Sequence, residues 1–575
     1  MERGYSKFSG IVVNEKKIES EISDITRKTN SDSEIIALLL QKEISTNKSL
    51  LHSIQRIFSM IHGEASIGFL FTDYNVLTLA TNTGSIYCLK NNDIFLFASE
   101  RFIVSELCKN KKFKGFLKSE DIFQLKPSQG CLIDIQYANF TIFNVSKSSN
   151  DRNVYTIVDP LSNQRASIID HSDYNNDKKT SISNYDIGDR ENIRRMIIEN
   201  YQPNMDLRRC TKCILPETFP YIDFDDRGVC NYCRDYSPIQ LKGSEALLDL
   251  VKENKRGDGK QDCIIGFSGG RDSSYVLHYA RKKLGVNPIA FTYDWGMVTD
   301  IARRNCARVC GALEVEHIVV SADLEKKRRN VRLNLNAWLK KPDLGILPLL
   351  MAGDKQFYYF AHKIREDTGI SFVLGGANPY ERTDFKLGFC GISPDDTRGK
   401  GLLTGIKFSN KVKLLLYYVR HYLFNPAYIN ASIFDTFHAF YSTYVLKDAY
   451  INIYDYIPWN EEEVVSLLRT TYDWEIAPDT TTTWRIGDGK ADFYNYVYYN
   501  VAGFSEIDTF RSNQVRAGAI TREEALKLAE DENKPRSASL EWYAETIRFN
   551  LEDALNTVNG GVEMHKSGGL KVLTC

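Results

Sequence analysis

The residues Cys263-Ile-Ile-Gly-Phe-Ser-Gly-Gly-Arg-Asp-Ser-Ser274 contain the strongest structural signal in this chain. The apolar run Cys263–Phe267 predicts a buried strand, and apolar residues at helical spacing from Asp272 to Leu284 predict a helix. The glycines between them let backbone N–H groups approach an anion, and the helix start adds unpaired N–H groups and a partial positive charge. Strand, glycine loop and helix in this order predict a phosphate-binding loop.

This loop supplies most of the candidate nucleotide-binding residues. Its Ser-Gly-Gly-Arg-Asp-Ser pattern is not the Walker pattern, which ends in Gly-Lys-Ser/Thr. The Asp272 carboxylate is a candidate magnesium ligand, and its alternative role is to cap the helix. The alternative for the whole stretch is a glycine turn without a ligand. The residues expected to bind pyrophosphate and magnesium are Ser268, Gly269, Gly270, Asp272, Ser273 and Ser274.

Strands and helices alternate after the loop. Strands are expected at 289–293, 315–320 and 372–374, with helices at 298–310, 323–338 and 347–366. This alternation predicts an α/β fold with a doubly wound parallel sheet, in which ligands bind beyond the carboxyl ends of the strands. That crevice should contain Gly375-Gly-Ala-Asn378 and Asp294, which is expected either to bind a ribose hydroxyl or magnesium or to form a turn.

Polar side chains near this crevice are candidates for catalysis. Lys355 and Arg382 are expected to balance phosphate charge, although a solvated position is favoured for Arg382. Asp354, Asn378 and Glu381 fall where a substrate should sit, and helix capping is their alternative role. The predicted catalytic residues are Asp272, Lys355, Asn378 and Glu381.

Other candidates lie further along the chain. Trp484, Arg485 and Arg516 suit a diphosphate, because arginine pairs with phosphate through two parallel hydrogen bonds, and a structural ion pair is the alternative. The aromatic run Phe493–Tyr499 is expected in the core or a subunit interface more than against a sugar or base. His278 is expected to be a satisfied histidine rather than a catalytic one.

Four cysteines form one compact motif. Cys210-Thr-Lys-Cys213 is followed after sixteen residues by Cys230-Asn-Tyr-Cys233. Two pairs at this spacing predict a Zn²⁺ site, which is structural because protein fills all four positions. An iron–sulfur cluster is the alternative. The predicted metal ligands are Cys210, Cys213, Cys230 and Cys233.

The composition is that of a globular protein of several domains. The chain has 575 residues, 43% of them hydrophobic and 26% charged, and a net charge of −1 that does not favour a nucleic-acid partner. The amino end lacks the apolar core of a signal peptide, and the most apolar region, 414–429, is interrupted by Arg420, His421 and Pro426, so no membrane span is expected. The 12 cysteines fit a reduced, cytoplasmic location.

The sequence around these motifs resembles known enzymes. The loop resembles the SGGxDS loop of N-type ATP pyrophosphatases. Two segments around the cysteines are similar to the N-acetyl sugar amidotransferases of surface-polysaccharide (O-antigen) pathways. They are Arg209-Cys-Thr-Lys-Cys-Ile-Leu-Pro-Glu-Thr-Phe-Pro220 and Phe224-Asp-Asp-Arg-Gly-Val-Cys-Asn-Tyr-Cys233. The similarity continues through Gly353-Asp-Lys355, Gly375 to Glu381, Trp459-Asn-Glu461, Trp484 to Asp488 and Arg516 to Ala525.

This resemblance implies a reaction. Members of the family use ATP and ammonia to convert the N-acetyl group of a sugar into an acetamidino group. ATP, Mg²⁺ and Zn²⁺ are then the expected cofactors, and a nucleotide sugar is the expected substrate. The ammonia would come from glutamine through a glutaminase domain or partner. Whether the chain forms a homo-oligomer stays open.

The first 145 residues resemble the later part of a class II glutamine amidotransferase domain. Phe8-Ser-Gly-Ile-Val-Val-Asn14 and Thr29-Asn-Ser-Asp-Ser-Glu-Ile-Ile36 carry the resemblance, and Asp32 would hold the α-amino group of glutamine. The nucleophile of that family is an amino-terminal cysteine, whereas the first cysteine here is Cys88, expected to be buried and inert. Ser9 stands at the position of the family's oxyanion asparagine.

The chain as written is therefore not expected to hydrolyse glutamine by that mechanism. A longer natural chain, a separate polypeptide, or a docking role with ammonia supplied from elsewhere remain open. Because strands of the domain are missing, we expect poor order or a partner at the amino end.

Six segments follow from these features. A partial α+β amidotransferase-like domain precedes a linker, a zinc module, an ATP pyrophosphatase (PP-loop) domain, a mostly helical region and a flexible tail. Their expected boundaries are 1–145, 146–205, 206–240, 241–400, 401–560 and 561–575.

Three other functions remain open. The first is a tRNA-modifying sulfur or amide transferase, an enzyme class that uses the same loop and the same pairs of zinc-binding cysteines. Cys306 and Cys310, one helical turn apart, are consistent with it. An amide ligase similar to asparagine synthetase is the second. A non-enzymatic assembly protein that binds no nucleotide is the third.

Overall fold

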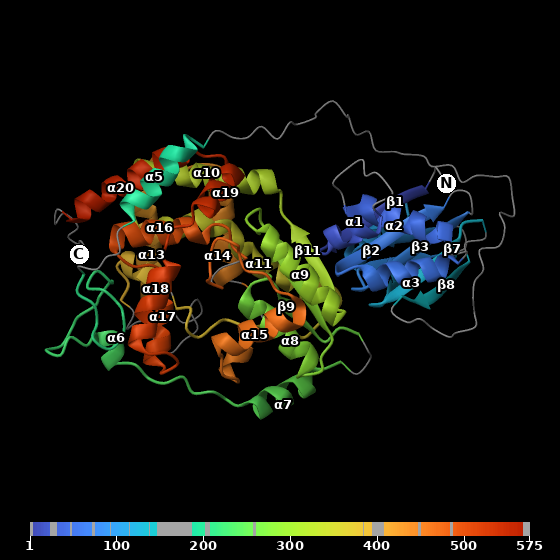
Figure 1. The fold of residues 1–575 in the computed structure, drawn as a ribbon, viewed down its shortest axis with the longest axis horizontal. Helices are drawn as coiled ribbons and strands as arrows, with labels where there is room; N and C mark the ends of the chain where they lie inside the picture. Colours follow the sequence, from blue (N-terminus) through green and yellow to red (C-terminus); the bar gives the residue numbers. More distant parts are fainter. Residues whose placement is uncertain are drawn as a thin grey trace.

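The structure is a computed structural model that describes residues 4–22, 32–46, 49–71, 75–91, 94–113, 115–136, 139–145, 187–201, 207–256, 260–382, 385–393, 408–444, 446, 450–483 and 487–566. Two units are visible in Figure 1: an amino-terminal unit (residues 4–145), drawn in blue, and a larger unit (residues 187–566). Among the described helices, none is long and apolar enough to cross a membrane.

The amino-terminal unit consists of two antiparallel sheets between helices. The first sheet has the strand order β1-β2-β3-β7-β8 and the second β5-β4-β6. The strands are β1 (Gly4–Val12), β2 (Gly63–Phe71), β3 (Val76–Thr81), β4 (Ile86–Lys90), β5 (Phe95–Ala98), β6 (Ile122–Leu125), β7 (Gln129–Asp134) and β8 (Phe140–Asn144). The helices are α1 (Glu15–Glu21), α2 (Asp32–Thr46), α3 (Leu50–Met60) and α4 (Arg101–Lys109).

Three apolar layers hold this unit together. Helices α2 and α3 pack on the first sheet, through residues such as Leu39 and Ile57 against Ile67. The two sheets pack against each other around Cys88 and Cys131, while α4 covers the outer face of the second sheet. Cys88 is thus buried between sheets, as expected, and burial raises the pKa of its thiol well above the ordinary value.

The larger unit contains a parallel sheet of order β11-β10-β9-β12-β13. Its strands are β9 (Cys263–Gly266), β10 (Pro288–Asp294), β11 (Glu316–Ser321), β12 (Phe372–Gly375) and β13 (Tyr450–Asn452). The connecting helices are α8 (Arg271–Lys282), α9 (Asp300–Leu313), α10 (Leu324–Lys340) and α11 (Gln356–Thr368). The α/β class and the strands expected before residue 375 are confirmed.

Two details differ from the sequence prediction. The helix expected at 347–366 is a 3₁₀ segment, Leu347–Lys355, followed by α11. Strand β13 lies in the region expected to be mostly helical. A strand of three residues is too short to show alternation, and its parallel pairing with β12 is a long-range contact.

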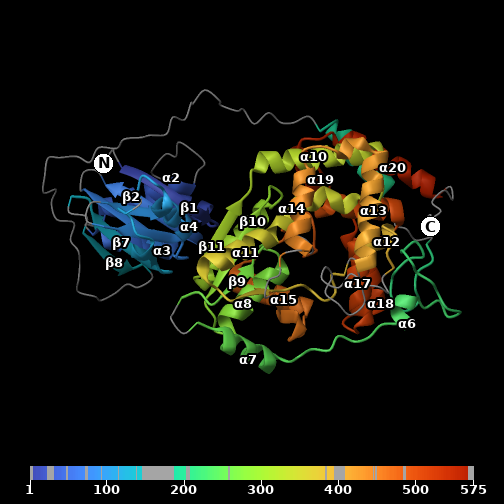
Figure 2. The same cartoon turned by 180° about the vertical axis from the view of Figure 1, so that it is seen from behind.

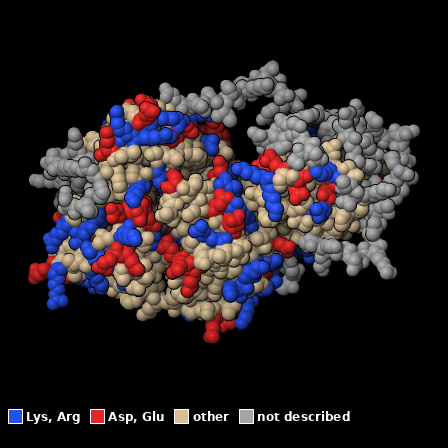
Figure 3. Space-filling model, in the orientation of Figure 1, with Lys and Arg blue, Asp and Glu red and all other residues tan. Residues whose placement is uncertain are grey.

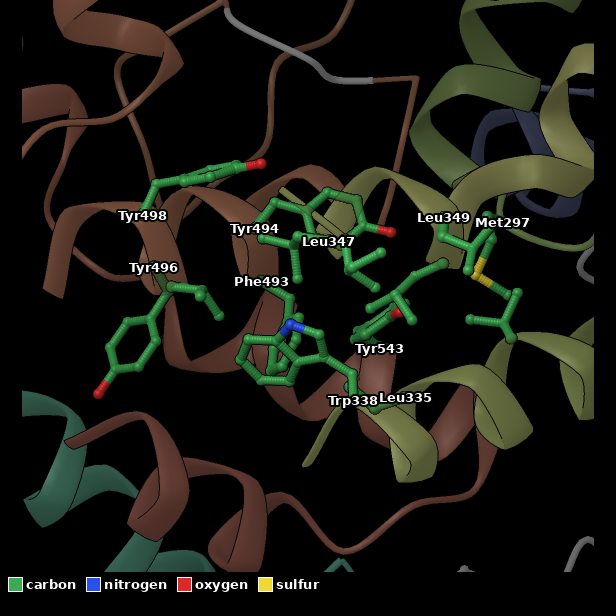
Figure 4. Close-up of a cluster of buried hydrophobic side chains, with 14 of the residues drawn as sticks. Met297, Leu335, Trp338, Leu347, Leu349, Phe493, Tyr494, Tyr496, Tyr498 and Tyr543 are labelled. Atoms are coloured by element: carbon green, nitrogen blue, oxygen red, sulfur yellow. The ribbon is translucent and has the colours of Figure 1, made fainter. Parts of the chain in front are cut away.

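Apolar clusters cover both faces of the parallel sheet. On one face, Ile265 and Phe267 pack against α8 and α9 through Leu277 and Val309. On the other face, Phe291 belongs to a large aromatic cluster. Figure 4 shows Trp338 and Leu335 of α10 packed with Phe493, Tyr494 and Tyr543. The run Phe493–Tyr499 is therefore core, as favoured from the sequence.

Helices form the rest of the larger unit. They are α5 (Arg190–Asn200), α6 (Asn231–Arg234), α7 (Ser244–Asn254), α12 (Phe385–Phe389), α13 (Phe408–Phe424), α14 (Ile433–Tyr444), α15 (Glu461–Tyr472), α16 (Ala491–Ala502), α17 (Glu506–Arg516), α18 (Arg522–Glu532), α19 (Ser537–Ile547) and α20 (Leu551–Lys566). Helix α20 extends into the segment expected to be a tail, while residues 567–575 and most of the expected linker, 146–186, lie outside the described residues.

The two units meet at helix α9 and strand β11, as Figures 1 and 2 both show. Helix α9 packs against β1 and β2. A Cβ at Gly311 of α9 would lie 2.2 Å from the carbonyl oxygen of Gly63, so only glycine allows this approach. Strand β1 is an edge strand among the described strands, so the poor order or partner expected at the amino end stays a prediction.

Candidate functional site

The loop after β9 lies at the carboxyl end of the parallel sheet, where Ser268 is exposed, Gly270 is half-buried and Gly269 is buried. Gly269 has φ +71°, and a Cβ there would lie 2.3 Å from the carbonyl oxygen of Ala302. The hydroxyls of Ser268 and Ser273 lie 3.0 Å apart, and the Gly270 N–H donates to Ser268 Oγ at 3.3 Å. A glycine is required at position 269 for both the backbone angle and the close contact.

Two neighbours complete the loop. Trp474 Nε1 donates to the carbonyl oxygen of Gly269 at 3.0 Å and so holds the loop in place. The Ser274 hydroxyl is buried and has no hydrogen-bond partner among the described residues. A buried hydroxyl without a partner is costly, so a ligand oxygen at the loop would satisfy it. His278, by contrast, is paired with the Tyr472 hydroxyl at 2.6 Å, as expected for a satisfied histidine.

Three of the predicted catalytic residues gather between β9 and β12, where the winding of the sheet changes direction. Asp272 Oδ1 accepts from Trp459 Nε1 at 2.6 Å and from Asn378 Nδ2 at 3.3 Å. Glu381 lies 3.8 Å from the Arg271 guanidinium, which also lies 3.6 Å from Asp272. The structure thus brings Asp272, Asn378 and Glu381 together around one arginine.

Arg271 is the residue of this group that the sequence did not single out. Its side chain is 3% exposed and donates to Glu461 at 2.7 Å. Arg511 pairs with the same glutamate at 2.6 Å and also with Glu532. Burial opposes ionisation of Glu461, but the two arginines outweigh it and hold the pKa of Glu461 below its ordinary value. This chain of charges anchors the start of α8 to α15 and α17.

Lys355 lies in a second cluster. It is 3.6 Å from Asp354, whose other oxygen is 2.9 Å from Lys490. Lys490 is nearly buried over the Trp295 ring, 4.3 Å from its centroid. Burial raises the pKa of Asp354, but the two lysines outweigh it and lower that pKa overall. Lys490 was missed from sequence because no motif marks it.

One segment links the two clusters. A Cβ at Gly487 would lie 2.8 Å from the carbonyl oxygen of Ser268, and Gly489 N donates to the Met297 carbonyl at 3.2 Å. The segment 487–490 therefore crosses from the loop after β9 to the loop after β10. The neighbouring Trp484 and Arg485, candidates for diphosphate binding, lie outside the described residues.

The remaining candidates have structural partners. Asp294 is buried, accepts from Gly296 N at 2.9 Å, and pairs through its other oxygen with Arg303. A ligand of Asp294 would have to displace Arg303. A Cβ at Gly375 would lie 1.7 Å from the Tyr450 hydroxyl oxygen, so packing alone explains this glycine. Arg382 is exposed, as favoured from the sequence.

The four cysteines of the predicted metal site converge. All four sulfurs lie within 4.8 Å of one another and are buried. Cys210 Sγ is 3.9 Å from Cys233 Sγ, and Cys213 Sγ is 3.8 Å from Cys230 Sγ. A tetrahedron of sulfurs around zinc has edges of about 3.8 Å, and a disulfide is far shorter, at about 2.05 Å. The cluster therefore fits a metal ion.

Backbone donors support this cluster, as N–H groups do around thiolates. The N–H groups of Lys212, Cys213 and Cys230 point to Cys210 Sγ at 3.2–3.4 Å. Arg516 donates to Cys213 Sγ at 3.4 Å, and Arg522 donates to the carbonyls of Cys210 and Cys213 at 3.1 Å. Arg516, a candidate for diphosphate binding, is thus engaged at the cysteine cluster.

A hollow in the described part of the chain lies away from this loop. Its volume is about 860 Å³, and it lies between the two units, lined by residues such as His52, Asn82, Arg308 and Asp473. No residue of the loop after β9 lines it. We therefore place the candidate site by the loop geometry and not by cavity size.

Comparisons with known proteins give distant matches. No family model matches the chain. A stretch of 119 residues is 25% identical to an uncharacterized protein of Methanocaldococcus jannaschii, covering 20% of this chain and 43% of the archaeal protein. The chain thus spans less than half the length of that relative.

Two solved structures are also similar in part. One is glutamine phosphoribosylpyrophosphate amidotransferase from B. subtilis complexed with ADP and GMP, with 15% identity and a TM-score of 0.21, over 25% of this chain and 29% of that one. The other is described as the allosteric regulatory enzyme of purine biosynthesis, with 13% identity and a TM-score of 0.21, over 55% of this chain and 60% of that one. Similarity at this level establishes neither fold nor activity.

Proposed function

We propose that this chain is an ATP-dependent amidotransferase that activates an amide oxygen of a nucleotide sugar and replaces it with nitrogen. One observation carries the proposal: a Ser-Gly-Gly loop, with Ser268 exposed, lies at the point where the winding of a parallel sheet changes direction, and the neighbouring Asp272 accepts a hydrogen bond from Asn378. Ligands bind at such points in open α/β sheets. The resemblance to the N-acetyl sugar amidotransferases supplies the substrate class.

The loop suits a pyrophosphate group. It offers the hydroxyls of Ser268 and Ser273 and the unpartnered hydroxyl of Ser274, next to the N-terminus of α8. Asp272 is only partly buried and would be the magnesium ligand, which neutralises phosphate charge. Trp459 and Asn378 hold its carboxylate in one orientation.

The proposed reaction has two steps. The acetamido oxygen attacks the α-phosphorus of ATP, the bond from that phosphorus to the β-phosphate oxygen breaks, and pyrophosphate leaves. Ammonia then adds to the activated carbon, the bond from carbon to the adenylated oxygen breaks, AMP leaves, and the protons lost by nitrogen pass to solvent. The loop would hold pyrophosphate, and Lys355, with Lys490 beside it, would offset the negative charge.

The four-cysteine cluster would hold Zn²⁺ in a structural role. The four sulfurs converge within 4.8 Å of one another. Within the described part of the chain, none of them contacts the loop after β9. Through Arg516 and Arg522 the cluster is tied to α17 and α18. The zinc would therefore stabilise helix α17, which carries Arg511 of the buried charge network.

The sulfur-transfer alternative is disfavoured by burial. Cys306 and Cys310 are both buried, and burial raises the pKa of each thiol well above its ordinary value. A Cβ at Gly269 would lie 3.0 Å from Cys306 Sγ, so this thiol lies beneath the loop and not in the crevice. Figure 3 also shows acidic and basic side chains interspersed on the visible face, without a basic surface for tRNA.

A substrate screen tests the proposal. Pyrophosphate and AMP are measured with Mg-ATP and ammonium in the presence of a UDP-linked N-acetyl sugar, tRNA or aspartate. We expect equal amounts of both products with the sugar alone. Stimulation by tRNA alone or aspartate alone would establish one of the alternatives. Absence of thermal stabilisation by Mg-ATP would favour a non-enzymatic role.

A matched pair of serines tests the site. Ser273→Ala removes a hydroxyl at the loop, and we expect kcat/KM for ATP to fall about 10-fold to 100-fold. Ser371→Ala removes an exposed hydroxyl at the opposite, amino edge of the same sheet, 3.5 Å from the Asn254 carbonyl. We expect this control to keep full activity. Equal activity of both variants would contradict the assignment of the loop.

A further inference from the structure

Three metal-ligating side chains converge where the two units meet. Glu64 comes from β2 of the amino-terminal unit, while Cys310 and His317 come from α9 and β11 of the larger unit. One ligand atom from each lies within 4.8 Å of the other two. They belong neither to the nucleotide site nor to the four-cysteine cluster.

Hydrogen bonds determine where His317 carries its proton. The Thr292 hydroxyl donates to the carbonyl oxygen of Phe267, which only accepts. The same hydroxyl oxygen lies 2.7 Å from His317 Nε2, so it must accept there and Nε2 must carry a proton. The other ring nitrogen, Nδ1, then faces both oxygens of Glu64 at 3.2 Å.

A neutral His317 would leave this arrangement repulsive. With the proton on Nε2, the lone pair of Nδ1 would point at an ionised carboxylate, and the His317 and Glu64 side chains are only 3% and 13% exposed. Either a proton, carried by Nδ1 or by the carboxylate, or a metal ion must therefore stand between them.

Cys310 favours the metal ion. Its sulfur joins the same cluster and makes no hydrogen bond within the described part of the chain. A protonated histidine would satisfy Glu64 but offer nothing to this thiol. A divalent cation bound by a thiolate, a carboxylate and a neutral imidazole gives a site with no net charge, which suits a buried position.

We propose that Glu64, Cys310 and His317 bind a second Zn²⁺ ion that joins the amino-terminal unit to the larger unit. Thiolate, imidazole and carboxylate are the ligands zinc takes, with water in the fourth position. A metal-binding histidine usually donates its other N–H to an oxygen, as His317 does to Thr292. Through Thr292 the site is connected to Phe267, which directly precedes Ser268 of the loop.

Metal analysis of the full chain tests the proposal. The protein is loaded with zinc under reducing conditions, dialysed, and its zinc content measured by mass spectrometry. We expect about two zinc ions per wild-type chain and about one in Cys310→Ala. The matched control is Cys306→Ala, which removes a buried thiol one turn away on the same helix and should keep about two.

A second measurement avoids dependence on variants. Zinc X-ray absorption of the wild-type chain should show nitrogen and oxygen neighbours as well as sulfur. Sulfur neighbours alone, with about one zinc per chain, would overturn the proposal and leave a protonated His317 paired with Glu64. Zinc content that stays at about two in Cys310→Ala would overturn it as well.

Discussion

Glu461→Gln is the substitution that tests the buried charge chain beneath the loop most directly. Glu461 accepts from Arg271 at 2.7 Å and from Arg511 at 2.6 Å. The arginine side chains are 3% and 4% exposed, and glutamine keeps the size of the side chain while removing its charge. Arg271 would then keep the carboxylates of Asp272 and Glu381, at 3.6 and 3.8 Å, and its hydrogen bond to Thr483 Oγ1 at 2.8 Å.

The expected loss follows from this geometry. Removing one partner of a buried ion pair costs about 3–5 kcal/mol, because a buried charge is left without compensation. Glu461 is 23% exposed, and two carboxylates remain near Arg271, so we expect a loss below that range, about 2–3 kcal/mol. Because α8 begins at Arg271, we also expect a higher KM for ATP.

Urea unfolding followed by tryptophan fluorescence measures this loss. All 6 tryptophans lie between Trp295 and Trp542, so the signal reports on the larger unit alone. With a slope of about 3 kcal/mol per molar urea, the midpoint should fall by about 1 M. The control Glu462→Gln changes an exposed neighbour on the same helix and should leave the midpoint unchanged.

The pH dependence provides an independent check. Since the pKa of Glu461 is lowered on folding, its contribution is present above the ordinary value of 4.5 and is lost as pH falls through the folded pKa. The difference between wild type and Glu461→Gln should therefore be largest near neutral pH and shrink below 4.5. A difference under about 0.5 kcal/mol at pH 7 would refute the argument that this network holds the loop.

Three further predictions concern the glycines of the loop, the four-cysteine site and Glu316. Gly269→Ala should lower stability by about 1–2 kcal/mol through its backbone angle alone and abolish pyrophosphate release, whereas Gly270→Ala, with φ −74°, should fold normally in thermal melts. Cys230→Ser should reduce the zinc content of the four-cysteine site and the melting temperature; unchanged zinc would contradict the metal assignment. Burial raises the pKa of Glu316 to about 7 despite donors from Tyr87, Gln124 and Gln261, so stability should fall as pH rises from 4.5 to about 7, and calorimetry of Glu316→Gln should show a flatter dependence.

Local signals explain what could be predicted from the sequence. The loop from Ser268 to Ser274 and the cysteine pairs are each encoded within a few residues, so spacing was enough. The strands after Cys263 are short apolar runs between turn signals, and their parallel order follows from the intervening helices. Asp272 and Asn378 could be placed in one crevice because both follow strands of the same sheet.

Long-range contacts explain what could not be predicted. Arg271 occupies a variable position of the loop motif, and its burial depends on Glu461, which lies 190 residues away. Lys490 reaches Asp354 across 136 residues, and no periodic pattern records that contact. Strand β13 pairs with β12 although only three residues take part. In each case the partner is distant in sequence, so the signal is absent from any local window.

Helix α9 has a double role that follows from its contacts. Its first turns support Gly269 through Ala302 and Cys306, and its last turns meet the amino-terminal unit through Cys310 and Gly311. Because a helix is stiff over such a short length, a shift of the amino-terminal unit cannot be absorbed within α9. The chain from Glu64 through His317 and Thr292 ends at Phe267, which directly precedes the same loop. Both paths of contacts run from the amino-terminal unit to the loop that we assign to ATP, so we expect a displacement of that unit to shift the serines.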